Sequence, residues 1–472
     1  MMSQPGKWKI LFTVAFGTFM ATLDSSIVNI ALPTIRSDLQ AGDNTEWIVL
    51  SYLLVTTSTL LIMGRLSDMF GRKGIYIAGF CIFVLGSFLC GLAWDIWSLV
   101  GFRVVQGLGA SMIFAIGPAI VSDAFQPQER GRALGWIGTI VAAGSSTGPV
   151  AGGLLLEHFG WPSIFYVNVP IGAVAIWRAF AVLPPSPRVA RQSFDLIGAA
   201  LFFTGVTTLL IGIDFGAEAV RGWTDSSVIT LICTGLFLLL LFLLWEKRHT
   251  APMLRLSLFN IRHFSSAISV AGIGFIATGA NIYVIPFYLQ LLLHYSPQDA
   301  GLIMLAGPLT LSVAAPLGGY LSGRISTRLL ASTGLLFAAT GYFLFSFLEA
   351  SWSWQDVIWR SALVSLGFGL FQSPNSSSAL NASPVAVRGV ASSLLAFMRN
   401  LGLVLGIALG AAVWYSLRNS YAETHLTDPL SQAAQIAGMQ TVYRVTSALL
   451  LAAVCISALR GPNRPAGDPY DA

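Results

Sequence analysis

The sequence predicts an all-α polytopic membrane protein with fourteen transmembrane helices, arranged as two similar six-helix bundles plus two extra central helices. Hydrophobic residues make up 55% of the 472 residues, and charged residues make up only 10%. A soluble protein of this length could not bury so much apolar surface, whereas lipid can solvate it. In addition, a pattern of arginine and glycine recurs 258 residues later in the chain, which predicts two related halves.

Fourteen apolar segments are long enough to cross about 30 Å of hydrocarbon at about 1.5 Å per residue. They are 9–31, 46–63, 75–93, 97–122, 133–154, 161–182, 195–215, 226–245, 264–291, 298–321, 328–348, 353–376, 389–416 and 437–460. The loops between these segments are short and leave no room for a soluble catalytic domain.

The distribution of basic residues predicts the orientation of the chain. With the N-terminus inside, eighteen of the 26 Lys and Arg residues lie in inner loops and tails, and only Arg36, Arg221 and Arg418 lie in outer loops. Cytoplasmic loops of membrane proteins carry such an excess of Lys and Arg. We therefore expect both termini in the cytoplasm. This topology explains the net charge of +5 better than a nucleic-acid partner does.

An internal repeat divides the chain. Glycines follow Arg130 at 14, 18 and 22 residues, and the same three spacings follow Arg388. Packing of small residues between helices would explain either series alone, but not the offset that both series share with an Arg-Gly pair. We therefore expect an N-terminal bundle over 1–182, two linker helices within 183–262, and a C-terminal bundle over 263–472.

Four motifs carry a resemblance to a known family. They are LDSSIVNIALP at 23–33, GRLSDMFGRK at 64–73, RVVQGLG at 103–109 and GSSTGPVAGG at 144–153. In this order and topology they resemble motifs of the major facilitator superfamily, and within it the fourteen-spanner drug:proton antiporters. Residues 161–172 are similar to a further segment of that branch, although Pro162 and Ser163 stand where Arg-Trp is expected. The resemblance covers essentially the whole chain and implies the major facilitator fold.

Asp24 is the one carboxylate that the predicted topology places in the middle of a span. An acid inside the bilayer is costly and is therefore a functional-site hypothesis. Counting residues along the helices places Asp24 in the outer half of the membrane, at the level of Arg103. A buried acid beside an arginine stays ionised, whereas one that loses its partner tends toward protonation. Asp24 and Arg103 are therefore the proton-coupling candidates, and a fixed ion pair that only joins two helices is the alternative.

The loop after the second span is a candidate conformational latch. Its glycines, Gly64 and Gly71, suit turns, and Asp68 and Arg72 lie at the inner membrane face. The resemblance implies that Asp68 contacts the start of the thirteenth span, where a helix N-terminus favours a carboxylate. A basic loop that only sets topology is the alternative. The second-half copy has Gly323 in place of the acid, so we expect an asymmetric latch.

The fifth span carries the motif that resembles the antiporter signature: Gly144, Gly148, Pro149, Gly152 and Gly153. Glycines four residues apart form a flat helix face that permits close approach of another helix. Proline removes a backbone hydrogen bond and permits bending. A hinge for alternating access and a purely packing role both remain open, and we expect no direct substrate chemistry there.

The resemblance implies a substrate cavity lined by the first, fourth, ninth and twelfth spans. The candidates from these later spans are Asn281, Tyr283, Tyr288, Gln290, Arg360, Phe371, Gln372 and Asn375. For any one of them, hydrogen bonding between helices is the alternative role. The later spans carry Arg360 and Arg399 and no mid-span acid, which favours monovalent, neutral or anionic amphipaths over dications.

These features favour proton-coupled efflux of amphipathic small molecules, with a specific endogenous metabolite or lipid as the alternative cargo. An enzyme would need a cluster of catalytic groups at one depth, but the five histidines are scattered at helix ends. The sequence has no Walker loop, so we expect a proton gradient to supply the energy. We expect no metal, no cofactor and no nucleic-acid partner, and a monomer in the lipid bilayer of a bacterial cell membrane.

Overall fold

The computed structural model describes residues 4–40, 45, 47–185, 194–217, 222–249, 252–426, 428–429 and 431–460. Helices are the regular elements of this described part, and it contains no strand. The α-helices are α1 (Gln4–Asp38), α2 (Trp47–Phe70), α3 (Arg72–Gly91), α4 (Ile96–Ala124), α5 (Pro127–Phe159), α6 (Ser163–Tyr166), α7 (Asn168–Val182), α8 (Leu196–Ala217), α9 (Ser226–Arg248), α10 (Arg262–Phe287), α11 (Pro297–Met304), α12 (Ala306–Leu321), α13 (Thr327–Phe345), α14 (Trp354–Asn381), α15 (Arg388–His425) and α16 (Gln432–Ala458). Two 3₁₀ segments, η2 (Leu256–Asn260) and η4 (Val385–Val387), and one π-helical turn, η3 (Tyr288–Leu292), complete the set.

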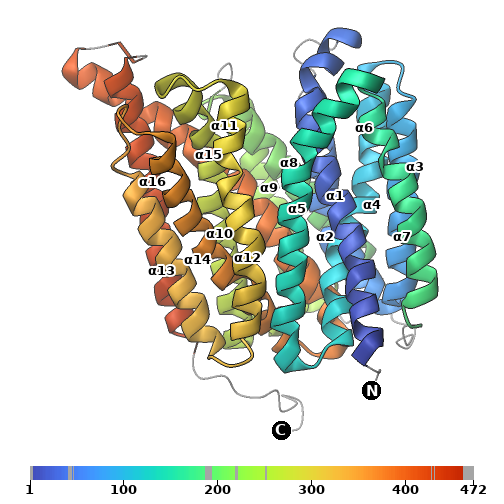
Figure 1. The fold of residues 1–472 in the computed structure, drawn as a ribbon. Helices are drawn as coiled ribbons and strands as arrows, with labels where there is room; N and C mark the ends of the chain where they lie inside the picture. Colours follow the sequence, from blue (N-terminus) through green and yellow to red (C-terminus); the bar gives the residue numbers. More distant parts are fainter. Residues whose placement is uncertain are drawn as a thin grey trace.

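Thirteen helical segments of the described chain are long and apolar enough to cross a membrane. The predicted segment that is missing from this set is 353–376, which corresponds to α14. At 28 residues, α14 is long enough to span a bilayer, but it carries polar residues such as Asp356, Arg360 and Gln372. It lies within the bundle, where it packs against α12 and α13 (Figure 1).

Two of the predicted spans carry a one-residue irregularity but continue as single helices across it. The segment 161–182 comprises α6 and α7, and the segment 298–321 comprises α11 and α12. Each irregularity follows the residue four positions before a proline, namely Tyr166 before Pro170 and Met304 before Pro308. Proline cannot donate the backbone hydrogen bond to that carbonyl, so the helix loses one bond there, while Val167 and Leu305 keep a helical backbone conformation.

The internal repeat is confirmed by equivalent helix packing in the N-half (α1–α7) and the C-half (α10–α16). Helix α5 packs along α1 and crosses to contact α12, while α15 packs along α10 and crosses to contact α2. The contact points match: a Cβ atom on Gly389 would lie 2.7 Å from the Gly64 carbonyl oxygen, and one on Gly131 would lie 3.1 Å from the Gly319 carbonyl oxygen. The two halves therefore join through the same backbone-to-backbone contact, used twice.

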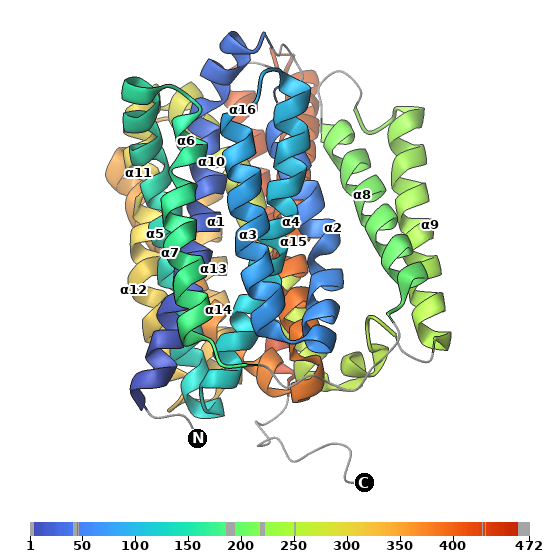
Figure 2. The same cartoon turned by 90° about the vertical axis from the view of Figure 1, so that its right-hand side faces the viewer.

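Helices α8 and α9 form a separate hairpin beside this bundle. They pack mainly against each other, and α8 also contacts α2 and α15. Figure 2 shows the pair standing at one side of the molecule. The division of the chain at 182 and 262 stays a prediction, because parts of the connections on either side of the pair lie outside the described residues.

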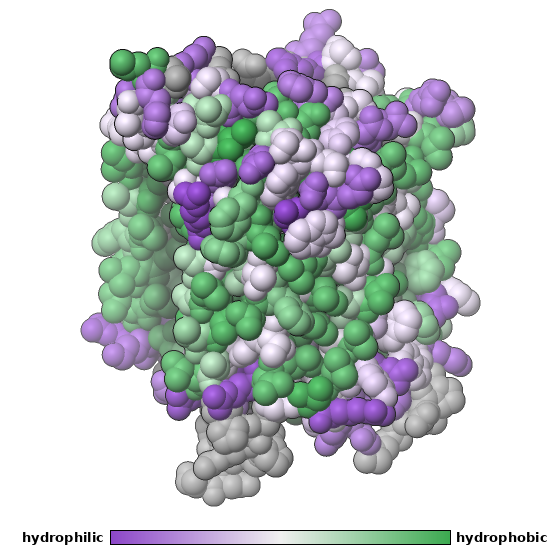
Figure 3. Space-filling model, turned by 60° about the vertical axis from the view of Figure 1, so that its left-hand side comes forward, coloured by the Kyte–Doolittle hydropathy of each residue, from purple (hydrophilic) through white to green (hydrophobic). Residues whose placement is uncertain are grey.

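Helix α1 begins and α16 ends at the same end of the bundle, which we call the terminal end (Figure 1). The helices of the two halves converge toward this end and diverge toward the opposite end. Hydrophobic side chains cover most of the middle of the surface in Figure 3, and hydrophilic side chains gather toward both ends. Such a belt is the surface that a lipid bilayer solvates.

Candidate functional site

Asp24 lies in the middle of α1 with no exposed surface, at the centre of a polar network inside the N-half. Arg103 Nη1 donates a hydrogen bond to Asp24 Oδ2 over 2.7 Å. Gln106 Nε2 and Asn168 Nδ2 each donate to Asp24 Oδ1 over 2.8 Å. Three donors and no acceptor match the ionised form of a carboxylate, and an arginine partner compensates its charge.

The network also fixes Arg103 from several sides. Its Nε donates to the Ile48 carbonyl oxygen over 3.1 Å, and its Nη1 also donates to Gln106 Oε1 over 2.6 Å. The guanidinium lies over the Tyr52 ring, 4.2 Å from the centroid. Ser87 Oγ accepts hydrogen bonds from Gln106 and from Asn168. The network therefore connects α1, α2, α3, α4 and α7 through groups that are buried from solvent.

Gln106, Asn168 and Ser87 were not among the predicted site residues. Gln106 carried a usable signal, because it stands one helical turn after Arg103 in the quoted fourth-span motif. Asn168 also carried one, as an amide in the apolar segment 161–172. Ser87 carried none, because a single serine in an apolar helix more often bonds to its own backbone.

Asp68 lies at the contact between α2 and the N-terminus of α15. Its Oδ1 accepts a hydrogen bond from the Gly389 amide over 2.9 Å, and its Oδ2 accepts one from the Val390 amide over 3.0 Å. These amides belong to the first turn of α15, where they lack intrahelical partners and where the helix dipole favours a negative charge. Arg72 pairs with Asp68 over 3.1 Å and donates to the Val385 carbonyl oxygen over 2.9 Å.

Asp123, at the end of α4, extends this contact into a network of four charges. It pairs with Arg72 and, over 2.8 Å, with Arg388. The repeat-related residues are Arg130 of α5 and Asn381 at the end of α14. There the arginine donates a hydrogen bond to a neutral amide oxygen and not to a carboxylate. Asp123 was missed because it stands outside the motifs, although an acid ending a helix beside a basic loop was a visible signal.

Of the two glycines in the motif at 64–73, Gly71 serves a turn, whereas the expectation of a turn at Gly64 was wrong because Gly64 lies inside α2 and permits close approach of another helix. A Cβ atom on Gly64 would lie 2.7 Å from the Gly389 carbonyl oxygen, so α2 and α15 touch there. Gly71 has a φ of 95° and precedes the first residue of α3. Only glycine adopts this conformation without strain.

One face of α5 packs tightly on α1. A Cβ atom on Gly144 would lie 3.1 Å from the Phe19 carbonyl oxygen, one on Gly148 2.5 Å from Ser26 Cβ, and one on Gly152 2.8 Å from Ile27 Cγ1. A Cβ atom on Gly153 would meet nothing within 4 Å. Pro149 lies within α5, but its side chain is outside the described part of the structure. This geometry establishes close packing, and the hinge stays a prediction.

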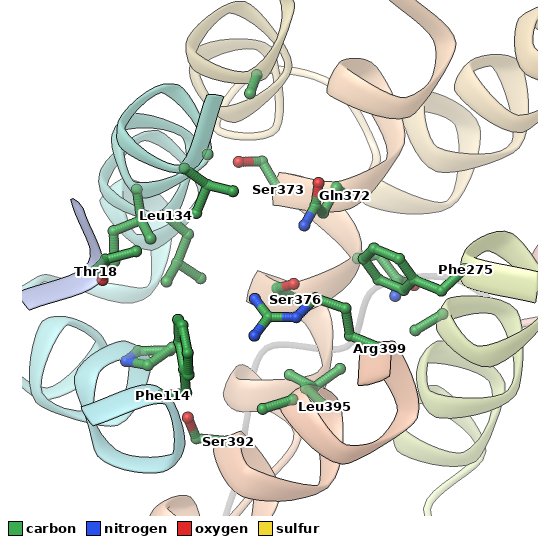
Figure 4. Close-up of a pocket in the computed structure, with 18 of the residues that line it drawn as sticks. Thr18, Phe114, Leu134, Phe275, Gln372, Ser373, Ser376, Ser392, Leu395 and Arg399 are labelled. Atoms are coloured by element: carbon green, nitrogen blue, oxygen red, sulfur yellow. The ribbon is translucent and has the colours of Figure 1, made fainter. Parts of the chain in front are cut away.

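A cavity of about 100 Å³ lies between the halves, with walls from α1, α4, α5, α10, α12, α14 and α15. Three predicted substrate residues line it: Phe371, Gln372 and Asn375. Figure 4 shows Arg399 of α15 reaching into this space from the side opposite Phe114, with Ser376 beside it. Arg399 was noted in the sequence as an arginine within a span, but it was not placed in the cavity. Asp24 and Arg103 do not line the cavity.

The other five predicted substrate residues lie away from the cavity. Three of them bond within the C-half: Asn281 accepts from Tyr443, the Tyr283 hydroxyl meets that of Tyr415, and Tyr288 donates to the Glu349 carbonyl oxygen. The remaining two are Gln290, which is exposed, and Arg360, which pairs with Asp356 over 3.1 Å and lies over the Trp352 ring. Among the described residues, no group of three His, Cys, Asp or Glu side chains could hold a metal ion.

Comparison with known proteins identifies the class to which this fold and cavity belong. The Major Facilitator Superfamily family model matches residues 14–407, and the chain belongs to that superfamily. It is therefore a membrane transporter and not an enzyme. The riboflavin transporter RibZ of Clostridioides difficile strain 630 is 37% identical over 85% of this chain and 87% of its own length.

Other relatives carry other names. The multidrug resistance protein Stp of Mycobacterium tuberculosis is 33% identical over 88% of this chain and 77% of its own length. The multidrug export protein EmrB of Haemophilus influenzae is 30% identical over 90% of this chain and 85% of its own length. The crystal structure of the human organic anion transporter MFSD10 superposes with a TM-score of 0.70, covering 96% of this chain and all of that chain. At 14% identity, this likeness concerns the fold alone.

Proposed function

We propose that this transporter exports amphipathic small molecules in exchange for protons, as a fourteen-span member of its superfamily. Relatives with multidrug names and 30–33% identity support export of such compounds. The length and packing of α14 support its role as the fourteenth span. The observation that carries proton coupling is the fully buried network around Asp24, because an ionisable group held in this way inside a membrane protein is typical of a proton pathway.

The excess of basic residues supports assignment of the terminal end to the cytoplasm. Under that assignment, the contacts of Asp68, Arg72 and Asp123 close the cytoplasmic side of the transporter. The conformation is then closed to the cytoplasm with Asp24 ionised. Protonation of Asp24 would remove its attraction to Arg103 and weaken the link between α1 and α4, which is how a proton would favour a different packing of the N-half.

The decisive variant is Asp24→Asn, because it removes the titratable group and keeps its shape. In everted vesicles, we expect it to abolish efflux driven by an imposed pH gradient, at normal protein abundance. Exchange of substrate at equal pH on both sides should persist, since it needs no proton movement. A matched control is Glu157→Gln, which makes the same kind of change on an exposed acid of α5. Unchanged pH-driven efflux in Asp24→Asn would mean that Asp24 and Arg103 form a fixed ion pair that only joins two helices.

A second candidate function is export of one specific metabolite on the same fold. The 37% identity to a riboflavin transporter favours it. Transport assays of riboflavin and of chemically varied amphipaths, with and without a pH gradient, distinguish multidrug export from export of one metabolite. Efflux of several unrelated compounds supports the multidrug function, and efflux of a single compound supports the metabolite.

A further inference from the structure

Arg399 is a cation in the central cavity without a carboxylate partner in the described chain. Its Nε donates a long hydrogen bond of 3.4 Å to Asn400 Oδ1, and its guanidinium lies 4.9 Å from the centroid of the Phe114 ring. Among the described residues, no Asp or Glu lies within ion-pair distance of Arg399 and none lines the cavity. Figure 4 shows the guanidinium directed into the open space.

A second cation lies behind the cavity wall. Arg460 is only 1% exposed and donates hydrogen bonds to Ser266 Oγ and to Asn375 Oδ1. Asn375 lines the cavity, so its amide connects Arg460 to that space. Arg460 Nη1 has no hydrogen-bond partner in the described part of the structure. Both arginines therefore contribute positive potential to a cavity whose described lining supplies no negative charge.

Arginine stays protonated inside proteins, so the charge cannot be relieved by losing a proton. A desolvated charge without a counter-ion is costly, and a bound anion would compensate it. The walls also contain three phenylalanine rings, Phe114, Phe275 and Phe371, together with the amide of Gln372 and the hydroxyl of Ser376. An arginine beside aromatic rings and neutral hydrogen-bonding groups suits a planar ring that carries an acidic group.

The size of the cavity limits what it holds in this conformation. Its volume of about 100 Å³ is below the roughly 150 Å³ of an apolar cavity known to bind benzene. The space therefore accommodates an acidic group with part of one ring. A whole aromatic acid, benzoate included, therefore needs the two halves to move apart as it binds.

We propose that Arg399 forms an anion subsite of the central cavity, which binds the carboxylate of an aromatic acid. The proposal rests on the proposed export function for its use of this cavity as the substrate site, and it adds the charge class of the preferred substrate. Arg399 supplies the charge, Phe114 and Phe275 contact the ring, and Gln372 and Ser376 bond to the carboxylate.

Binding of benzoate tests the subsite, with benzamide as a neutral molecule of the same shape and benzylammonium as a cation. Saturation-transfer NMR on the full chain in phosphatidylcholine nanodiscs measures each affinity at equilibrium. We expect benzoate to bind about tenfold more tightly than benzamide, the order expected for a hydrogen bond to a charged group. Arg399→Gln should remove this preference, and Arg399→Lys should retain part of it. Arg444→Gln, which alters an exposed arginine of α16, is the matched control and should behave as the wild type.

Equal affinity for benzoate and benzamide in the wild type would overturn the proposal. So would tighter binding of benzylammonium, no saturable binding of benzoate, or an unchanged preference in Arg399→Gln. If Arg399→Gln does not fold, the wild-type preference and its partial retention in Arg399→Lys decide the matter. Full displacement of benzoate by equimolar inorganic phosphate would contradict recognition of the ring. Because no pH gradient is applied, absence of proton coupling would leave these affinities intact, so the two failures are distinguishable.

Discussion

At the scale of single residues, Asp24 and Arg103 depend on each other. Arg103→Ala would leave the Asp24 carboxylate buried without its charge partner, and such a loss typically costs about 3–5 kcal/mol. We expect a correspondingly lower unfolding temperature for Arg103→Ala in detergent. Adding Asp24→Asn should recover part of the loss, because the second change removes the uncompensated charge. Simple addition of the two effects would contradict direct coupling between the side chains.

The candidate site residues were predictable from the sequence only in part. Asp24, Arg103 and Asp68 were predictable as unusual charges in otherwise apolar segments, and their positions within motifs gave them neighbours. The division of the eight substrate candidates was not predictable. Phe371 and Asn375 line the cavity while Tyr283 and Asn281 bond within the C-half, because the direction of each side chain depends on the rotation and tilt of its helix. Arg399 reaches the cavity for the same reason.

At the scale of helices, thirteen of the fourteen predicted spans correspond to segments able to cross a membrane, and proline explains the local irregularities within two of them. Pro170 and Pro308 each follow a one-residue irregularity in the helix, whereas Pro118, Pro286, Pro316 and Pro374 lie inside regular helices. Neighbouring helices can satisfy the backbone groups that a proline leaves unpaired, so its effect depends on packing that a sequence does not reveal. Packing also explains how α14 can carry polar residues. Several of them, such as Asn375, are buried in the interior of the bundle.

The packing of α5 against α1 gives a matched pair of substitutions. Gly148→Ala would place a methyl group 2.5 Å from Ser26 Cβ, whereas Gly153→Ala would place one in open space. We expect Gly148→Ala to destabilise the protein by about 1–3 kcal/mol, the usual cost of overpacking. Gly153→Ala should be neutral or slightly stabilising, because alanine favours a helix. Thermal unfolding measures both. Normal stability of Gly148→Ala with slower transport would instead favour the hinge.

At the scale of the whole molecule, the sequence repeat predicted the similarity of the halves, and the structure shows where they differ. Both halves use a glycine contact of the same kind, at Gly64 with Gly389 and at Gly319 with Gly131. Only the first contact carries an acid, since Gly323 stands where Asp68 would be in the repeat. The contact of α2 with α15 therefore carries a negative charge that the contact of α5 with α12 lacks, as predicted. This charge would favour the conformation in which the halves are joined at the terminal end.

Asp68→Asn tests whether this charge holds the two halves together at the terminal end. The change keeps the side-chain shape but removes the negative charge from the first turn of α15, an interaction worth up to about 2 kcal/mol in partly buried sites. A loss of about 1–2 kcal/mol would raise the population open at the terminal end roughly 5- to 30-fold. Spin labels at exposed Gly74 and Arg328, in a cysteine-free background, report the distance between the halves at that end. We expect a longer-distance population in Asp68→Asn and none in the control Glu157→Gln. Identical distance distributions would mean that Asp68 does not hold the halves together and that the basic residues of its motif only set the topology of the chain.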